Sequence, residues 1–364
     1  MAGKRHPMPH QSTDQTIGLG HGSGGAAMQQ LIKDELLSVL PGQNPDALED
    51  AAVLDLPPGR IAFTTDSFTV QPLEFPGGSI GHLAVHGTVN DLAMRGAKPL
   101  HLSVGMIIEE GLPLETLRRI VTSMGEATRE AGVSIVAGDT KVVGRGQADG
   151  IYINTSGIGA CRPHCPSVAA ARPGDRVIVN GTMGDHGVAV MIAREDLQVT
   201  ADLRSDTAAL YSLVEAMLAA GGEGLHTLRD LTRGGLAAGL NEIASASVVG
   251  ISVDSRAIPV RSEVGGVCEI LGLSPYSVAN EGKLVAMAAP DVADAVLAAM
   301  QAHPLGADAA IIGEVTDASG TPSRVPGTTA PGAVGSTGLV RLITAIGTTR
   351  VLELPAGELL PRIC

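Results

Sequence analysis

The order of apolar segments along the chain limits the folds that it can adopt. Up to about residue 170, short apolar runs typical of strands alternate with helical patterns, and Gly or Pro stands at many of the transitions. A turn cluster, Arg172-Pro173-Gly174-Asp175, then opens a second half with the same alternation. Because 364 residues suffice for two domains, we expect an α/β fold with mixed sheets in two domains.

The expected elements follow the periodicity of the apolar residues. Helices are predicted over residues 26–40, 80–95, 113–131, 187–194, 206–220, 235–246 and 292–302. Strands are predicted over 61–65, 102–108, 134–137, 151–159, 176–180, 283–288 and 309–314. The expected organisation is a disordered segment over 1–16, domains over 17–170 and 171–350, and a mobile tail over 351–364. Residues 321–338, rich in Pro, Gly, Thr and Ser, indicate a long loop or an insertion.

Composition and charge exclude several classes of protein. Hydrophobic residues make up 44% and charged residues 17%, which is typical of a globular chain. A net charge of -13, together with 3 Phe, 3 Tyr and no Trp, argues against nucleic-acid binding. No apolar run reaches the roughly 18 residues of a membrane span. The polar N-terminus lacks the pattern of a signal peptide, so we expect a cytoplasmic protein.

The cysteines are too few for a disulfide framework, at 4 in the whole chain. Cys161-Arg162-Pro163-His164-Cys165 gathers three potential metal ligands, but a zinc site needs a fourth ligand and none is evident. A plain loop is therefore the favoured interpretation. Cys268 lies in a helical apolar pattern and is expected in the core.

The last residue of the sequence is itself a cysteine, Cys364. One interpretation is a frayed chain end that happens to carry a thiol. The other is a swinging arm that carries a chemical group on its sulfur. The ten residues from Pro355 to Cys364 can span about 33 Å, which is enough to reach a pocket on the same chain or on a neighbour.

A glycine-rich stretch, His21-Gly22-Ser23-Gly24-Gly25, precedes the first predicted helix. Its backbone N–H groups, with a helix N-terminus, could hold a phosphate group. Gly20 to Gly25 also fits G-x-G-x-x-G, but the strand that the dinucleotide fingerprint requires is missing before it. A flexible linker and a phosphate clamp both remain open.

Acidic residues stand at the ends of predicted elements, and they are Asp50, Asp66, Asp91, Asp139 and Asp230. Each alone is commonly a cap or a turn residue. Several acids at the mouths of adjacent strands favour Mg²⁺, which takes a few carboxylates together with phosphate oxygens.

Six motifs carry a resemblance to a known family. They are Glu49-Asp50-Ala51-Ala52-Val53, Asn90-Asp91, Gly138-Asp139-Thr140-Lys141-Val142-Val143, Asp230 to Gly235, Asn280-Glu281-Gly282 and Pro361-Arg362-Ile363-Cys364. From about residue 17 to 364 the chain closely resembles the HypE family of hydrogenase maturation factors. The acidic motifs are shared across the aminoimidazole ribonucleotide synthetase (PurM-like) superfamily, whereas the terminal P-R-I-C is specific to HypE. The resemblance implies a two-domain PurM-like fold with a flexible C-terminal tail.

The same resemblance implies an activity and partners. It implies a homodimer whose first domains pair their sheets, with ATP and Mg²⁺ near that interface. A carbamoyltransferase, HypF, would load a carbamoyl group onto Cys364. ATP-dependent dehydration would then turn the thiocarboxamide into a thiocyanate, whose cyanide passes to a HypC–HypD scaffold and on to the iron of [NiFe]-hydrogenase.

Residue roles also follow from the resemblance. The expected catalytic residues are Cys364, Lys141 and Glu281, and the last two would remove protons near the thiocarboxamide. The expected nucleotide-binding residues are Gly22, Ser23, Gly24, Gly25, Asn90, Asp139 and Thr140. The expected Mg²⁺ ligands are Asp50, Asp66, Asp91 and Asp230. Lys141 can act as a base only in a buried setting, and a phosphate-binding cation is the alternative role.

Two rival functions stay open from the sequence. One is another ATP-dependent enzyme of the superfamily, a selenophosphate synthetase or a small-molecule kinase. A selenophosphate synthetase would need a reactive residue near the N-terminus, whereas the first cysteine here is Cys161. The other rival is a non-catalytic scaffold whose tail docks to partners. A prenylation signal places its cysteine fourth from the end, so it does not apply.

Overall fold

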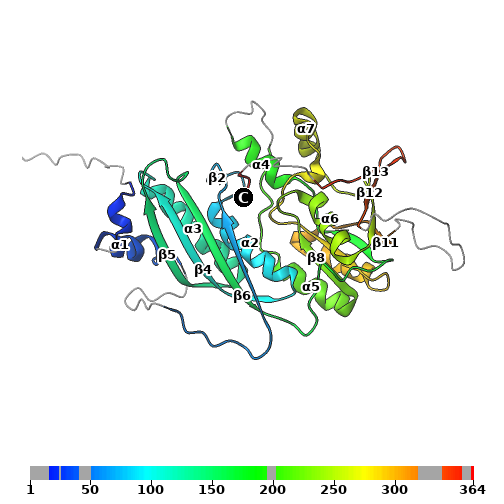
Figure 1. Ribbon diagram of the computed structural model, residues 1–364, viewed down its shortest axis with the longest axis horizontal. Helices are drawn as coiled ribbons and strands as arrows, with labels where there is room; N and C mark the ends of the chain where they lie inside the picture. Colours follow the sequence, from blue (N-terminus) through cyan, green and yellow to red (C-terminus); the bar gives the residue numbers. More distant parts are fainter. Residues whose placement is uncertain (1–15, 24–25, 41–50, 195–201, 319–337, 355–361) are drawn as a thin grey trace, which may run out of the picture.

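The structure is a computed structural model that describes residues 16–23, 26–40, 51–194, 202–318, 338–354 and 362–364 (Figure 1). It contains a four-stranded sheet from the first half of the chain, a seven-stranded sheet from the second half, and a short hairpin. Helices accompany both large sheets. The predicted α/β fold is confirmed.

The first sheet has the strand order β1-β6-β4-β5. Its strands are β1 (Ile61–Phe68), β4 (Lys98–Glu109), β5 (Ser134–Val143) and β6 (Ile151–Ala160). The strands β4 and β5 run parallel, as the crossover through helix α3 (Leu114–Ala131) requires, and the other pairs are antiparallel. Helix α3 follows Pro113 and ends at Gly132, whose φ of 67° lies in the left-handed region that favours glycine.

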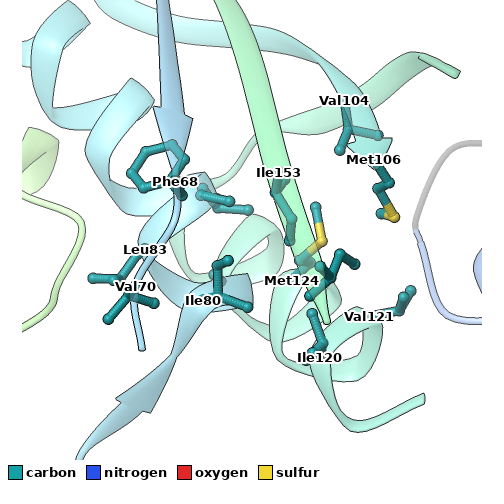
Figure 2. Close-up of a cluster of buried hydrophobic side chains, with 14 of the residues drawn as sticks. Phe68, Val70, Ile80, Leu83, Val104, Met106, Ile120, Val121, Met124 and Ile153 are labelled. Atoms are coloured by element: carbon teal, nitrogen blue, oxygen red, sulfur yellow. The ribbon is translucent and has the colours of Figure 1, made fainter. Parts of the chain in front are cut away.

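Two helices, α2 (Ile80–Met94) and α3, cover one face of this sheet. Figure 2 shows the apolar side chains that fill the space beneath them. The labelled members are Phe68, Val70, Ile80, Leu83, Val104, Met106, Ile120, Val121, Met124 and Ile153. This core comes from both helices and from three strands, so it fixes the helices against the sheet.

The opposite face of the sheet, which we call the open face, carries more exposed side chains. Along β1 the exposure alternates, so that Thr64, Asp66 and Phe68 face α2 while the residues between them face away. On the open face Phe63 is 69% exposed and Ile107 of β4 is 44% exposed.

The second sheet has the order β13-β12-β9-β11-β7-β10-β8. Its strands are β7 (Arg176–Val179), β8 (Leu225–Asp230), β9 (Gly250–Asp254), β10 (Leu284–Ala288), β11 (Ala310–Thr316), β12 (Val340–Ile343) and β13 (Thr349–Val351). Its helices are α4 (Asp185–Ala193), α5 (Tyr211–Gly221), α6 (Gly235–Ser247), α7 (Ser262–Leu271) and α8 (Ala293–Gln301). Alternate residues of β7 and β10 point into two cores, one that includes α6 and one that includes α5 and α8.

The remaining elements are short. They are α1 (Ala26–Leu31), a π-helical turn (Ile32–Leu36), 3-10 turns (Leu19–Gly22, Gly222–Gly224, Pro275–Ser277 and Pro304–Gly306) and the hairpin strands β2 (Glu74–Phe75) and β3 (Gly78–Ser79). No helix in the described ranges is both long and apolar enough to cross a bilayer.

Helix α2 lies at the junction of the two sheets (Figure 1). It contacts β1 and β6 on one side and α5 and β8 on the other. Nearly all of its side chains are buried, which is why its sequence is apolar around the whole circumference. Polar residues on this helix are therefore placed between the two halves of the molecule.

Most of the predicted helices and strands are confirmed within a few residues, but the extents of two predicted helices were wrong. The helix expected over 26–40 is split into α1 and a π-helical turn. The helix expected from residue 206 starts only at Tyr211, because other parts of the chain bind the backbone of the preceding segment. Strands β2, β3, β8, β9, β12 and β13 were not predicted. The domain limits stay a prediction, and the expectations for 1–15 and 319–337 fall outside the described residues.

Candidate active site

Three of the predicted aspartates gather where the first sheet meets the second. Asp66 comes from β1, Asp91 from the last turn of α2 and Asp230 from the end of β8. The hydroxyl of Thr64, which faces α2 like Asp66, donates a hydrogen bond of 2.7 Å to the Asp91 carboxylate. Asp66 in turn accepts the Ser67 N–H at 2.8 Å. The alternation along β1 thus directs Asp66 toward the helix that carries Asp91.

Burial raises the pKa of all three carboxyl groups. It is the largest cause for Asp66 and Asp91, and the charge of Asp66 raises the pKa of Asp91 further. For Asp230, burial and then the charge of Asp91 raise the pKa to about 6. The guanidinium of Arg229 lies 3.5 Å from the Asp230 carboxylate and opposes this shift only in part. The site holds more negative charge than its neighbours neutralise.

Glu281 lies beside these aspartates and is only 4% exposed. Burial, followed by the charges of Asp206 and Asp230, raises its pKa well above the usual range. Its Oε1 atom is buried without a hydrogen-bond partner, while its main-chain N–H donates to Asp206 at 3.0 Å. A carboxylate with a raised pKa and a free oxygen can accept a proton near neutral pH.

Carboxylate oxygens of this kind suit Mg²⁺. Within the described residues, no three His, Cys, Asp or Glu side chains stand in an arrangement that would already hold a metal ion. Asp50, the fourth predicted ligand, lies outside those residues, as do Gly24 and Gly25. The metal-ligand set stays a prediction.

Asn90 is buried next to Asp91 and fixes two segments of the second half. Its amide nitrogen donates to the main-chain oxygens of Ala208 at 3.0 Å and Glu281 at 3.2 Å. Its amide oxygen accepts the Leu210 N–H at 2.8 Å. With these groups occupied, Asn90 positions the segment that carries Glu281.

The chain end lies inside this junction. We call Arg362–Cys364 the terminal segment. Its backbone pairs with the residues that follow β1, since the N–H of Thr69 donates to the Cys364 oxygen at 3.1 Å and that of Gln71 to the Arg362 oxygen at 3.2 Å. Ile363 is only 2% exposed and joins the core of the first half. The terminal segment is therefore inserted and not frayed, whereas an arm that carries a group on its sulfur stays a prediction.

The thiol of Cys364 lies near Glu281, Arg233 and Asp66, each of which acts on its pKa. Burial is the largest cause and raises this pKa strongly, and the Glu281 carboxylate raises it further. The inserted sulfur is therefore a neutral thiol and not a nucleophilic thiolate.

Lys141 and Asp139 occupy a different place. Both lie on the open face, with side chains 62% and 65% exposed, and the lysine nitrogen is 2.6 Å from the carboxylate. Across the sheet, Asp139 of β5 pairs with Gly105 of β4, which pairs with Asn154 of β6, which pairs with Ser67 of β1. Asp139 therefore lies three strand spacings away from β1. Three strand spacings correspond to about 14 Å.

The structure therefore does not bring Lys141 beside Glu281 within one chain. Lys141 also lacks the burial that a base role requires, because it is exposed and paired with Asp139. Lys141 is the main cause that lowers the pKa of Asp139. Both residues line a cavity of about 400 Å³ on the open face, which Ser67 and Thr69 also line.

The predicted glycine-rich loop packs against the strand that carries this pair. A Cβ at Gly22 would stand 2.8 Å from the Val142 backbone nitrogen, so the close approach requires glycine. Ser23 donates to the Gly20 oxygen at 2.9 Å. Thr140, between Asp139 and Lys141, is buried. The loop and the Asp139–Lys141 strand thus share one edge of the sheet, as a phosphate site would need.

A second cavity, of about 330 Å³, opens beside Asp91. Leu92 and Val168 line it together with Arg95 and Arg229. No sequence motif includes Arg95 or Arg229, although each stands close to a predicted motif. Apolar walls with two guanidinium groups suit a base and its phosphates.

Other functional candidates were missed because no motif marks them. Asp206 forms an ion pair with Lys283 at 3.1 Å and holds the Glu281 N–H. His186 and Arg194 of α4 contact the terminal segment. Arg233 alone could have been found, since it lies in the motif that begins at Asp230.

The other cysteines are free thiols. Cys165 accepts from Arg60 at 3.4 Å, and His164 is directed to the Leu225 oxygen at 3.1 Å. No described group of ligands joins them into a metal site. Cys268 is buried in a core, as predicted.

Comparison with known proteins identifies the family. Residues 48–161 match the N-terminal domain of the AIR synthase related proteins, and residues 172–325 match the C-terminal domain. A protein named carbamoyl dehydratase HypE, from Rhizobium leguminosarum bv. viciae, is 52% identical over 96% of this chain and 95% of its own length.

Solved structures agree with this match. A structure of hydrogenase maturation protein HypE in complex with ATP has a TM-score of 0.88 and 46% identity, covering 96% of this chain and 100% of that one. A structure of a HypE-HypF complex has a TM-score of 0.74 and 47% identity, covering 91% of this chain and 100% of that one. The chain belongs to the HypE family of carbamoyl dehydratases, within the AIR synthase related proteins.

Proposed function

We propose that this chain uses ATP to dehydrate a carbamoyl group carried on the sulfur of Cys364. The thiocarboxamide would become a thiocyanate, and its cyanide would serve the maturation of a [NiFe]-hydrogenase. The observation that carries the proposal is the insertion of Cys364 beside the buried, unpartnered Glu281. A relative solved with ATP supports the use of that nucleotide.

The chemistry dictates what the residues must do. The amide oxygen leaves poorly as hydroxide, so it must first carry a phosphoryl group, which ATP supplies when bound. Conversion of S–C(=O)–NH₂ to S–C≡N then releases phosphate, and two protons leave the nitrogen. Glu281 is the acceptor that we assign to the first proton, which is lost as the oxygen takes the phosphoryl group, because its free Oε1 and raised pKa suit the task. The second proton leaves with the phosphate as the C–O bond breaks.

Mg²⁺ fits the cluster of aspartates. Asp66, Asp91 and Asp230 offer only oxygen donors, and their raised pKa values show negative charge that a cation would neutralise. We assign the ion to these three residues and to Asp50. When bound, it would offset the charge that develops on the phosphates.

Lys141 is assigned to ATP binding across a dimer. The resemblance to the family implies pairing of the open faces of two chains, on which Phe63 and Ile107 are exposed. Such pairing would bury Lys141 in the interface, where it can serve the partner's site. This arrangement removes the difficulty that Lys141 and Glu281 are far apart in one chain.

The burial and protonation of the Cys364 thiol indicate that a partner must load it. A buried neutral thiol cannot attack a carbamoyl donor, so loading requires the terminal segment to leave its site. A HypF-type carbamoyltransferase is the proposed loading enzyme, and the structure of a related HypE-HypF complex supports it. A HypC–HypD scaffold is the proposed cyanide acceptor. Four free thiols are compatible with the proposed cytoplasmic location.

The proposal is tested by measuring whether the use of ATP by this chain depends on Cys364. The chain is incubated with a HypF-type carbamoyltransferase, carbamoyl phosphate and ATP, and the release of ADP by this chain is compared with the water lost from its C-terminal peptide. We expect one ADP for each water lost and neither product with Cys364→Ala. Water loss without ADP, or thiocyanate formation by Cys364→Ala, contradicts the proposal.

A further inference from the structure

The inserted terminal segment is held from two directions. The segment after β1 binds it through the N–H groups of Thr69 and Gln71. Helix α4 binds it through His186, whose Nε2 is 2.8 Å from the Ile363 oxygen, and through Arg194, which donates to the Arg362 oxygen at 2.8 Å. The two directions correspond to the two halves of the chain.

His186 is fully buried, and its hydrogen bonds fix its tautomer. The Ile363 carbonyl can only accept, so Nε2 carries the hydrogen. Nδ1 therefore accepts from the Ser205 hydroxyl, 2.8 Å away. Burial lowers the pKa of His186, which keeps the ring neutral, and Phe75 packs edge-on against it at 5.4 Å.

The same contacts continue to the proposed base. Ser205 precedes Asp206, whose carboxylate accepts the main-chain N–H of Glu281 at 3.0 Å. The two segments also touch through their backbones, because a Cβ at Gly282 would stand 1.8 Å from the Asp206 oxygen. A short route of bonded groups thus runs from Ile363 through His186 and Ser205–Asp206 to Glu281.

We propose that His186 is a positioning residue that holds the terminal segment in its inserted state and couples this state to the placement of Glu281. When the segment leaves, the Nε2–H of a buried ring loses its acceptor, which favours return of the segment. Loss of the Ile363 bond also removes one constraint on Ser205 and hence on the segment that orients Glu281. The coupling to Glu281 rests on the proposed function, whereas the holding of the terminal segment does not.

The holding role is tested by the reactivity of Cys364 in the full-length chain. The alkylation rate of Cys364 by iodoacetamide is measured by mass spectrometry of the C-terminal peptide, with Cys161 and Cys165 as internal references. His186→Asn keeps a polar group near the Nδ1 position but removes the donor to Ile363, and it should raise the Cys364 rate roughly ten-fold. His186→Gln, which can place an amide N–H near the Nε2 position, should restore most of the slow rate.

A matched control is His82→Asn, a histidine of α2 that bonds Ser79 and lies away from the terminal segment. It should leave the Cys364 rate unchanged. Ser205→Ala keeps the donor but removes its orienting hydroxyl, and it should raise the rate by a smaller factor. An unchanged Cys364 rate in folded His186→Asn, or in Ser205→Ala if the first variant does not fold, overturns the holding role.

The coupling role is tested with the chain already carbamoylated. His186→Asn should lower the dehydration kcat while the KM for ATP stays the same, because the variant affects the inserted end and not the nucleotide. His186→Gln should recover kcat in step with the alkylation rate. Normal kcat in a variant with fast alkylation overturns the coupling. If the wild type alkylates slowly but never dehydrates, the proposed function fails and the holding role stands.

Discussion

The two faces of the first sheet differ in how far their acidic side chains are neutralised by neighbouring cations. On the face toward α2, burial raises the pKa values of Asp66 and Asp91, and no cationic group neutralises them fully. On the open face, Lys141 pairs with Asp139 and lowers its pKa. Acidic residues from motifs that one protein family shares therefore need not have the same role. The face toward α2 holds uncompensated charge suited to a cation, whereas the pair on the open face is already neutral as a whole.

The largest effect is expected in a test of whether Lys141 of one chain and Glu281 of its partner act in the same site. Glu281→Gln and Lys141→Ala should each lose activity as homodimers, by roughly 100-fold or more for the base variant. A heterodimer of the two, isolated through two affinity tags, should recover about half of the wild-type rate, since one of its two sites is complete. The rate of cyanation measures this, and an inactive heterodimer would show that Lys141 serves its own chain.

Asp230→Asn tests whether the buried aspartates on the side toward α2 carry negative charge that no neighbouring cation neutralises. Removing a proposed Mg²⁺ ligand should lower activity roughly 100-fold. The same change should stabilise the chain without nucleotide or metal at pH 7, by up to about 3 kcal/mol, since it removes a buried charge.

The sign of that effect follows from the raised pKa of about 6. The folded state binds the proton more tightly than the unfolded state, so the contribution of Asp230 to stability should fall as the pH rises from about 4 to 6. The stability difference between the variant and the wild type should therefore grow over this range and change little above it. Thermal unfolding of both proteins between pH 4 and 7.5 measures this. A variant less stable than wild type at pH 7 would mean that Asp230 is neutralised in the chain itself.

Lys141→Ala tests the cation role on the open face. Loss of a charge-assisted contact to phosphate should weaken ATP binding by roughly 10 to 100-fold, from about 1.5–3 kcal/mol. Calorimetric titration with ATP and Mg²⁺ measures the change, and Lys98→Ala, a lysine at the start of β4, is a matched control. Unchanged ATP affinity with a stalled carbamoylated chain would favour a role in proton removal.

Asp139→Asn should have the smallest effect. The ion pair with Lys141 is exposed on both sides, so its loss should change the free energy of unfolding by less than about 1 kcal/mol. Urea unfolding measures the difference. A larger loss of stability would show that the open face is packed by another chain under the conditions used.

The sequence predicted local features well and long-range ones poorly. Helix α3 was found because Pro113 and Gly132 mark its ends within the local pattern. The start of α5 was missed because residues 206–210 are held by Asn90 and Glu281, which lie far away in the sequence. The separation of Lys141 from Glu281 also depends on strand order, which no local motif encodes. The motifs identified the acidic residues, but only the folded structure shows on which face of the first sheet each of them lies.

Dehydration of the carbamoyl group on inserted Cys364 beside Glu281 is the step on which the proposed function depends. Its most direct test is the mass of the C-terminal peptide in a single turnover, with chains loaded by the carbamoyltransferase and then given ATP. The wild type should lose the mass of water, and Glu281→Gln should keep the carbamoyl mass, while the Lys98→Ala control behaves as wild type. Loss of water from Glu281→Gln at the wild-type rate would contradict the account.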